Sequence, residues 1–382
     1  MNLLIARHML RNQRTAFVAG LSVALWVICA ALLNAAQPGD NIEQLLWSRE
    51  FALGYAKHPP VSTWLLIGAN AVLGYSAQWT YLLAFLCRLL TLYFVYRIAC
   101  ELLDTDTALW VVLLLTLTHI FTRKAQFYNH NTVLILGLSI LTWMTLLVLK
   151  FNRRHHWFLL GLTSGLLVLI KYQSVIGLAV TGVILARWAN RSHIKGMFLC
   201  MVTSFVVILP HAYWLVGTSG SPSPITYALN HITQPSPEQA VKSILSYAVG
   251  LLKEYLVVGL WVLAMIAHQR FQYSNYLPDK LPVCAYTKSV IGHLTLTRLA
   301  FMLTLGFAGV ILQDHWVAPL AMFMSLPLAH LSRNYLGKVN RVHVRWYIFA
   351  QTLTLCFFIA QHLGYLNNRN TAHVERHLRA ES

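Results

Sequence analysis

Residues whose types could support chemistry are concentrated in one stretch near the N-terminus, residues 39–64, which reads GDNIEQLLWSREFALGYAKHPPVSTW. Asp40, Glu43 and Glu50 follow one another at spacings of three and seven, so a short helix beginning here would place their carboxylates on one face. A carboxylate beside a hydroxyl group can take its proton and act as a general base. Asp40 also has a structural interpretation, because an Asp at the start of a helix is a typical N-cap.

The chain as a whole is too apolar for an ordinary soluble protein, since 57% of its 382 residues are hydrophobic. Crossing the hydrocarbon of a bilayer takes about 20 helical residues, and apolar runs of about that length recur from end to end. The alternating polarity of a membrane β-barrel is absent, so helices must satisfy the backbone hydrogen bonds. The clearest runs are Ala16–Ala36, Val133–Leu149, Met197–Val216, Tyr247–Ala267 and Trp346–Leu366.

We therefore expect an all-α polytopic membrane protein with about eleven transmembrane helices. In this interpretation residues 1–382 form a single integral domain without a separate soluble C-terminal domain. The apolar N-terminal run lacks a small-residue cleavage site before the acidic stretch, which predicts a retained first span. The run Ala108–Phe121 is short for a crossing, and Val61–Leu73 is predicted either to lie in the membrane interface or to pack as a half-helix.

Basic residues outnumber acidic residues by 29 to 12, and they cluster in short turns between the apolar runs. Cytoplasmic loops of membrane proteins carry such an excess of Lys and Arg, so the charge mostly encodes topology. A nucleic-acid interface would need a basic stripe interleaved with aromatic residues, and the sequence has none. The clusters are Arg7/Arg11/Arg14, Lys150/Arg153/Arg154, Arg187/Arg191/Lys195 and Arg333/Lys338/Arg341/Arg345.

Placing these basic turns in the cytoplasm puts the unusual polar residues of the chain on the outer face. The acidic first loop lies there, and so do polar residues of the later outer loops. We expect any chemistry on that side. The later residues are Arg123/Lys124, Asn129/Asn131, Lys171/Tyr172, His211 and Asp314/His315.

The order of motifs in these loops resembles the polyprenyl-phosphate-sugar-dependent glycosyltransferases of GT-C fold, which include protein O-mannosyltransferases and bacterial lipid A aminoarabinose transferases. Asp40, Trp47, GY at 54–55, KHPP at 57–60 and Trp64 are similar to the first outer loop of the family. The similarity continues in order to about residue 322. The later similar segments are FYNHNTVLIL, GLLVLIKYQSVIGL, PHAYWLVGTSGSPSPITYALNH and DHWVAPLAM.

The resemblance implies a bacterial inner-membrane enzyme that moves a sugar from a polyprenyl phosphate to an acceptor hydroxyl on the periplasmic side. The acceptor would be a glycolipid such as lipopolysaccharide or lipid A, or less readily a protein. Asp40 matches the family's catalytic Asp, and Glu43 would assist it. Cations would bind the leaving lipid phosphate through charge-assisted hydrogen bonds. The residues implied in substrate binding are Tyr55, Lys57, His58, Arg123, Lys124, Asn131, Lys171, Tyr172, His211 and His315.

Two positions depart from the family pattern. Many relatives carry an Asp-Glu pair where this chain has Asp40-Asn41, and many carry an Asp where Asn131 stands, although a subset of bacterial relatives has Asn there. Asn131 cannot act as a base, so it would orient the acceptor or Asp40. The departures leave open a family member without activity. A transporter or flippase of lipid-linked sugars also stays open, although it would need paired broken helices and an internal repeat.

Several cations have simpler interpretations. Lys171 could be an interfacial lysine that snorkels to the membrane surface, and Arg123/Lys124 could anchor lipid headgroups. Arg88 and Lys253 are expected within the membrane, where cations are functional candidates by default.

The sequence predicts neither a metal nor another cofactor. His58, His211, His231 and His315 could approach one another at the outer face, but no two have the spacing of metal ligands on one helix. The six cysteines are scattered without a C-x-x-C pair, so neither a zinc ribbon nor a redox site is indicated.

Overall fold

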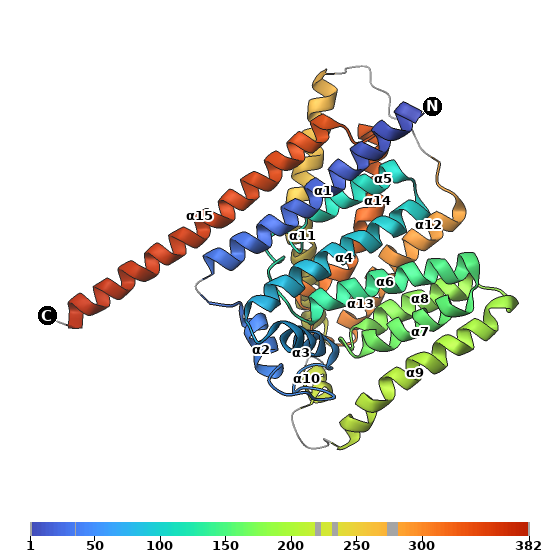
Figure 1. Cartoon of the computed structure of the whole chain (residues 1–382), viewed down its shortest axis with the longest axis horizontal. Helices are drawn as coiled ribbons and strands as arrows, with labels where there is room; N and C mark the ends of the chain where they lie inside the picture. The colour runs from blue at the N-terminus through green and yellow to red at the C-terminus, as the bar shows by residue number, and fades with distance from the viewer. Residues whose placement is uncertain (1, 35, 218–222, 231–235, 273–281, 381–382) are drawn as a thin grey trace.

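The computed structural model describes residues 2–34, 36–217, 223–230, 236–272 and 282–380, and helices make up most of this part (Figure 1). Among these residues, seven helical segments are long and apolar enough to cross a membrane, which confirms the polytopic helical architecture. They belong to α1 (Asn2–Leu33), α4 (Gln78–Leu102), α6 (His130–Phe151), α9 (Ile194–Gly217), α11 (Pro237–Gln272), α12 and α13 (Ala285–Gly292 and Arg298–Phe307) and α15 (Arg341–Ala380).

Four shorter helices complete the bundle: α5 (Thr105–Thr116), α7 (Arg154–Val168), α8 (Ser174–Trp188) and α14 (Ala318–Leu336). At 1.5 Å per residue, α5 is only about 18 Å long, which is less than the thickness of the hydrocarbon. The predicted number of about eleven spans is reached if these four helices also cross the membrane together with the seven longer segments. That number stays a prediction.

Three short helices lie together beyond one end of the long helices (Figure 1). They are α2 (Gly39–Trp47), α3 (Val61–Leu73) and α10 (Pro224–Leu229). α3 has the bounds of the predicted half-helix. Its first backbone amide, Val61 N, donates to Leu169 O at 2.9 Å, which ties the first loop to the end of α7.

Two connecting regions of the chain contain helices. Residues 285–297 form α12 and a π-helical turn (His293–Thr297) that continues into α13. The connection after α9 contains α10. There the Ser223 side chain accepts a hydrogen bond from Thr226 N and Pro224 occupies the first helical position, which are common features of a helix start.

α7 and α9 approach each other closely because α7 presents two glycines four residues apart. A Cβ added at Gly161 would lie 2.5 Å from the backbone oxygen of Cys200, and one at Gly165 would lie 2.7 Å from Cβ of Val207. Small residues at this spacing are typical of packed transmembrane helices. The contact places the C-terminal end of α9 beside the first outer loop.

α15 packs against α1 on one side of the bundle (Figure 1). Trp26 Nε1 donates to Gln351 Oε1 at 2.9 Å, and the Trp26 ring lies 5.4 Å from that of Phe358. Ser22 Oγ lies 2.6 Å from the Tyr347 hydroxyl. These contacts fix the outer end of α1, from which the first loop begins.

The basic turn after α6 lies at the opposite end of the bundle from α2 and α3. α6 begins with His130 at the outer end and, after 22 residues, ends at Phe151 next to this turn. Lys150 there pairs with Glu101 at 2.6 Å, and Lys338 pairs with Asp106 at 2.9 Å. This distribution is the one expected when the basic end faces the cytoplasm.

The sidedness can be tested by labelling engineered cysteines in spheroplasts with a membrane-impermeant maleimide. We expect Glu50→Cys to react, because Glu50 is exposed at the end that carries α2 and α3. Arg154→Cys, at the exposed basic turn, should react only after the membrane is opened. Labelling of Arg154→Cys alone in intact spheroplasts would reverse the topology.

Candidate active site

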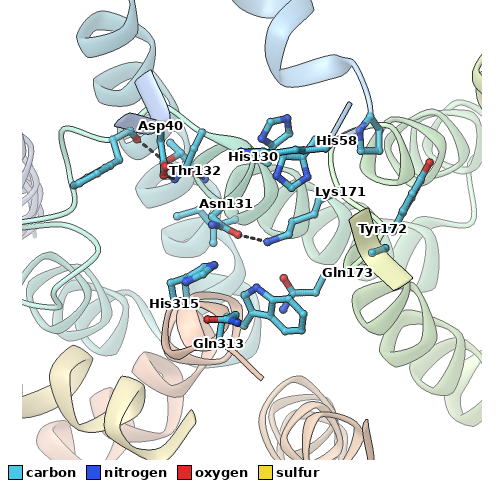
Figure 2. A pocket seen from close by; sticks show the side chains of 18 of the residues that line it. Asp40, His58, His130, Asn131, Thr132, Lys171, Tyr172, Gln173, Gln313 and His315 are labelled. Carbon is cyan, nitrogen blue, oxygen red and sulfur yellow. Dashed lines mark hydrogen bonds between the residues drawn. The ribbon is translucent and has the colours of Figure 1, made fainter. Parts of the chain in front are cut away.

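α2 and α10 border a cavity of about 780 Å³, which lies at the end of the bundle that carries α2, α3 and α10. Its walls come from α2, the KHPP segment, the start of α6, the turn between α7 and α8, α10, and the 3-10 turn η3 (Asp314–Val317). Figure 2 shows side chains from these separate elements converging on one space. The cavity contains nine of the residues predicted for the site: Asp40, Glu43, Lys57, His58, Lys124, Asn131, Lys171, Tyr172 and His315.

Asp40 lies in the first turn of α2 and faces the cavity, where it is exposed. The N-cap of α2 is Pro38, which makes no side-chain capping bond, so the interpretation of Asp40 as an N-cap is wrong. Instead, Asn129 Nδ2 donates to Asp40 Oδ2 at 2.6 Å. Asn129 is itself fixed, because its Oδ1 accepts from Thr132 N at 2.9 Å as the N-cap of α6. The carboxylate is thus positioned by the helix start opposite it.

Glu43 shares the cavity-facing side of α2 with Asp40, but Glu50 does not, because the helix ends at Trp47. The predicted alignment of three acids on one face is therefore wrong for Glu50. Lys57 Nζ donates to Glu43 Oε1 at 2.5 Å, and this bond raises the pKa of Lys57. Glu43 is engaged by Lys57, so it is less available to take a proton than Asp40.

Lys171 is a buried cation at the centre of the view in Figure 2. Its Nζ donates to Asn131 Oδ1 at 2.7 Å and lies 5.4 Å from the centre of the Trp316 ring. Burial lowers the pKa of Lys171 to about 8, although the charge of Asp40 acts in the opposite direction. A snorkelling lysine would be exposed, so that interpretation is wrong. Asn131 orients Lys171, whereas Asp40 is held by Asn129.

Arg88 brings a further cation to the cavity from the middle of α4. Its Nη2 donates to Lys124 O and to Thr132 Oγ1, both at 3.2 Å, while its buried Nε has no hydrogen-bond partner. Arg88 thereby ties the segment after α5 to the start of α6. The unsatisfied Nε–H is a buried donor next to the cavity.

The charges that line the cavity do not balance. Glu43 pairs with Lys57, and Asp314 pairs with Lys253 at 2.8 Å. Asp40 is the remaining acid, and within the described ranges no carboxylate lies within 4 Å of the cations Arg88, Lys124 or Lys171. His315 adds no charge near neutral pH, since burial and the charges of Lys171 and Lys124 lower its pKa to about 4. A cavity with this excess of cations is suited to an anionic ligand.

Aromatic side chains line the cavity beside these charges. The rings of His58 and His130 lie 3.9 Å apart, and Tyr227 of α10 meets His58 edge-on at 5.4 Å. Sequence reasoning placed Asn129 on the outer face but assigned neither it nor His130, Arg88 and Tyr227 to the site. The Asn129-x-x-Thr132 pattern before an apolar run was a usable signal, because it is typical of a helix N-cap.

Three residues predicted to bind substrate lie outside the lining of this cavity. Tyr55 donates from its hydroxyl to Glu50 O at 2.8 Å and stacks on Trp47, so it braces the first loop. His211 joins α9 to the turn after α7 and to the first outer loop, since Nε2 lies 2.8 Å from the Tyr172 hydroxyl and Nδ1 lies 2.6 Å from Leu53 O. Arg123 lines a second, smaller cavity.

The candidate histidines do not assemble into a metal site in the part of the chain that the structure describes. There, no three His, Cys, Asp or Glu side chains are grouped so that they could hold an ion. His211 is bound to Tyr172 and Leu53. His231 lies outside the described residues.

Asn41, where many relatives carry Glu, is fully buried behind α2 and is not part of the cavity lining. Its Nδ2 donates to Thr80 Oγ1 at 3.1 Å and to Gln126 O at 3.3 Å, and its Oδ1 accepts from Tyr128 N at 2.8 Å. A carboxylate could not donate these bonds. The amide therefore has a structural role here, since it anchors α2 to the segment before α6.

We expect Asn41→Asp to destabilise the protein, because a buried carboxylate would face the Gln126 carbonyl without a donor. An unsatisfied buried group costs about 3 kcal/mol or more when it is charged. The apparent unfolding temperature should fall by about 5 °C in a thermal-shift measurement. Asn230→Asp, at an exposed position directly after α10, is the control and should change the unfolding temperature little. Equal unfolding temperatures for the two variants would contradict a structural role of Asn41.

The bundle and its cavity define a class of protein. The chain has the GT-C fold, as shown by its similarity to ArnT from Cupriavidus metallidurans, whose crystal structure was determined bound to undecaprenyl phosphate. The TM-score is 0.62 at 12% identity, covering 88% of this chain and 62% of that chain. An oligosaccharyltransferase from Archaeoglobus fulgidus is similar with a TM-score of 0.55 at 12% identity, covering 90% of this chain and 54% of that chain.

The sequence comparisons point to the same class. The family of dolichyl-phosphate-mannose-protein mannosyltransferases matches residues 57–214. The lipopolysaccharide core galacturonosyltransferase RgtA from Rhizobium johnstonii is 27% identical over 217 residues, which cover 54% of this chain and 43% of RgtA. The chain thus spans less than two thirds of the length of RgtA and of ArnT. These matches confirm the resemblance to GT-C membrane glycosyltransferases that the outer-loop motifs indicated.

Proposed function

We propose that this protein is a glycosyltransferase that moves a sugar from a polyprenyl-phosphate donor to a hydroxyl group of a glycolipid, such as lipopolysaccharide or lipid A. The observation that carries the proposal is one cavity in which Asp40 faces Arg88, Lys124 and Lys171, three cations without a carboxylate partner within 4 Å in the described ranges. A base and an anion site are the two features that this reaction needs.

The reaction would proceed by displacement at the anomeric carbon of the sugar. The acceptor oxygen forms a bond to that carbon while the bond from the carbon to the phosphate oxygen breaks, and its electron pair stays on the phosphate. Asp40 takes the proton of the acceptor hydroxyl. Lys171, Lys124 and Arg88 offset the negative charge that grows on the departing polyprenyl phosphate. Glu43 assists indirectly, because it holds Lys57 at the cavity.

The apolar part of the lining supports a lipid-linked donor. A polyprenyl chain needs an apolar surface, and the cavity offers side chains from several helices next to its cations. The crystal structure of the ArnT relative with undecaprenyl phosphate supports the same donor class. The name of RgtA supports lipopolysaccharide as the acceptor. The apolar lining residues include Ile120, Phe127, Ile135, Val175, Ile176, Leu305 and Val310.

The location that fits these substrates is the bacterial inner membrane, with the cavity on the periplasmic side. The basic turns at the opposite end of the bundle support this orientation. Deletion of the gene should lower the mass of one cell-surface glycolipid by one sugar residue in mass spectra. The wild-type gene should restore the mass, and Asp40→Asn should not. Unchanged glycolipid masses after deletion would refute the proposed acceptor class.

A further inference from the structure

A second cavity of about 330 Å³ lies beside the first, between the outer ends of α1 and α15 and the segment 119–127 that follows α5. The proposed reaction assigns this cavity no role. Its lining combines cations, amides, an imidazole pair and two aromatic rings. The lining residues are Asn34, Ala36, Pro38, His119, Arg123, Lys124, Gln126, Phe127, Phe358 and His362.

The segment 119–127 forms a shared wall between the two cavities. Lys124 and Phe127 line both of them, while Ile120 lines only the first and Arg123 only the second. Pro38 lines the second cavity, and Asp40, two residues later, lines the first. The candidate base therefore lies at the boundary between the cavities, where a molecule bound in the second could present a group to the first.

The second cavity has the charge of an anion site. No carboxylate of the described residues lies within 4 Å of Arg123 or Lys124. His119 adds no charge, because burial and the charges of Lys124 and Arg123 lower its pKa to about 4. Its buried Nδ1 has no hydrogen-bond partner and lies 3.9 Å from Glu254 Oε1. The positive charge of this cavity thus comes from Arg123 and Lys124.

The neutral side of the cavity is built from fixed amides. Asn34 Nδ2 donates to Gln126 Oε1 at 2.6 Å, and His362 Nε2 lies 2.8 Å from Asn34 Oδ1. The outer ends of α1 and α15 next to these amides expose large apolar side chains, with Leu32 exposed by 80% and Leu363 by 54%. In a membrane-spanning helix such side chains face lipid. The cavity therefore joins an anion site to a surface suited to acyl chains.

We propose that this second cavity binds the anionic group, a phosphate or carboxylate, of the acceptor glycolipid, with Arg123 as its main cation. The acyl chains lie against the outer ends of α1 and α15, and the sugar hydroxyl reaches Asp40 across the boundary between the cavities. This inference rests on the proposed function. It assigns donor and acceptor to opposite faces of the segment 119–127.

The test measures equilibrium binding to the purified full chain in neutral detergent, which requires no transfer reaction. The probes are bisphosphorylated lipid A and its dephosphorylated form. Wild type should bind the phosphorylated probe at least about tenfold more tightly, and Arg123→Gln should weaken that binding about tenfold, as the loss of one exposed charge-assisted bond predicts. Binding of the dephosphorylated probe should not change, and Arg123→Lys should restore most of the affinity.

Arg49→Gln is the matched control, because Arg49 is exposed on the same end of the molecule but lines neither cavity. Equal effects of Arg123→Gln and Arg49→Gln would overturn the proposal. So would displacement of phosphorylated lipid A by an equal concentration of phosphatidylglycerol, since Arg123 would then be a general headgroup anchor. If binding follows the expected pattern but no sugar is transferred, the acceptor site stands and the proposed function fails. If sugar is transferred but binding does not follow the expected pattern, the proposed function stands and the acceptor site fails.

Discussion

Asp40→Asn should reduce sugar transfer by about 100- to 10,000-fold, which is the usual effect of removing a general base. The substitution changes little else. Asp40 caps no helix, and the Asn side chain keeps an oxygen that can accept from Asn129 Nδ2. Stability and donor affinity should therefore stay near the wild-type values. The measurement is the single-turnover rate of purified protein in liposomes, together with donor binding and thermal unfolding.

Glu43→Gln is the matched comparison for Asp40→Asn, because both carboxylates lie on the same side of α2. Glu43 is engaged by Lys57, so its loss should reduce transfer much less than the loss of Asp40. A rate for Asp40→Asn above a tenth of wild type would show that Asp40 is not the base. A deeper loss for Glu43→Gln would move that role to Glu43.

Lys171→Met should have the second largest effect, a loss of about 10- to 100-fold in kcat/KM for the donor. Met has nearly the volume of Lys but cannot donate to a phosphate, and Lys171 is buried with no carboxylate within 4 Å in the described residues. Lys57→Met is the control. Lys57 is half-exposed and neutralised by Glu43, so its loss should cost only a few-fold. Equal effects of the two variants would assign Lys171 no special role.

The pH dependence gives an independent test of Lys171. Burial lowers its pKa to about 8, so its ammonium is charged below that pH and loses its proton as the pH rises through it. We expect kcat/KM for the donor to fall above about pH 8, since this parameter reports the free enzyme. Lys171→Arg should keep its charge and remove that decline. A profile that is the same for wild type and Lys171→Arg would exclude Lys171 as its source.

Sequence patterns predicted the architecture well where physical constraints are strong and local. Long apolar runs cannot be placed in water, so they predict helices that span the membrane. The short run 61–73 cannot cross a bilayer, and α3 has the bounds that this run predicted. Nine of the residues predicted from the loop motifs line one cavity. These residues lie on outer loops, which the topology of the helices places at the same end of the bundle.

The pairing of side chains could not be predicted in the same way. Asn129 and Asn131 are two residues apart, and only the direction of the first turn of α6 decides that Asn129 meets Asp40 while Asn131 meets Lys171. Lys253 and Asp314 are 61 residues apart, and their contact depends on Gly250, where a Cβ would lie 2.2 Å from Asp314 O. Such contacts follow from packing between helices, which one sequence does not specify.

The most direct test of the account follows the sugar itself. Purified wild-type protein in liposomes would be given a polyprenyl-phosphate sugar labelled in the sugar, together with a lipid A acceptor. We predict that the label leaves the donor and appears on the glycolipid in equal amounts, with free polyprenyl phosphate as the second product, and that Asp40→Asn prevents this. Donor that crosses the bilayer intact, with no label on the glycolipid, would contradict the account and identify a transporter.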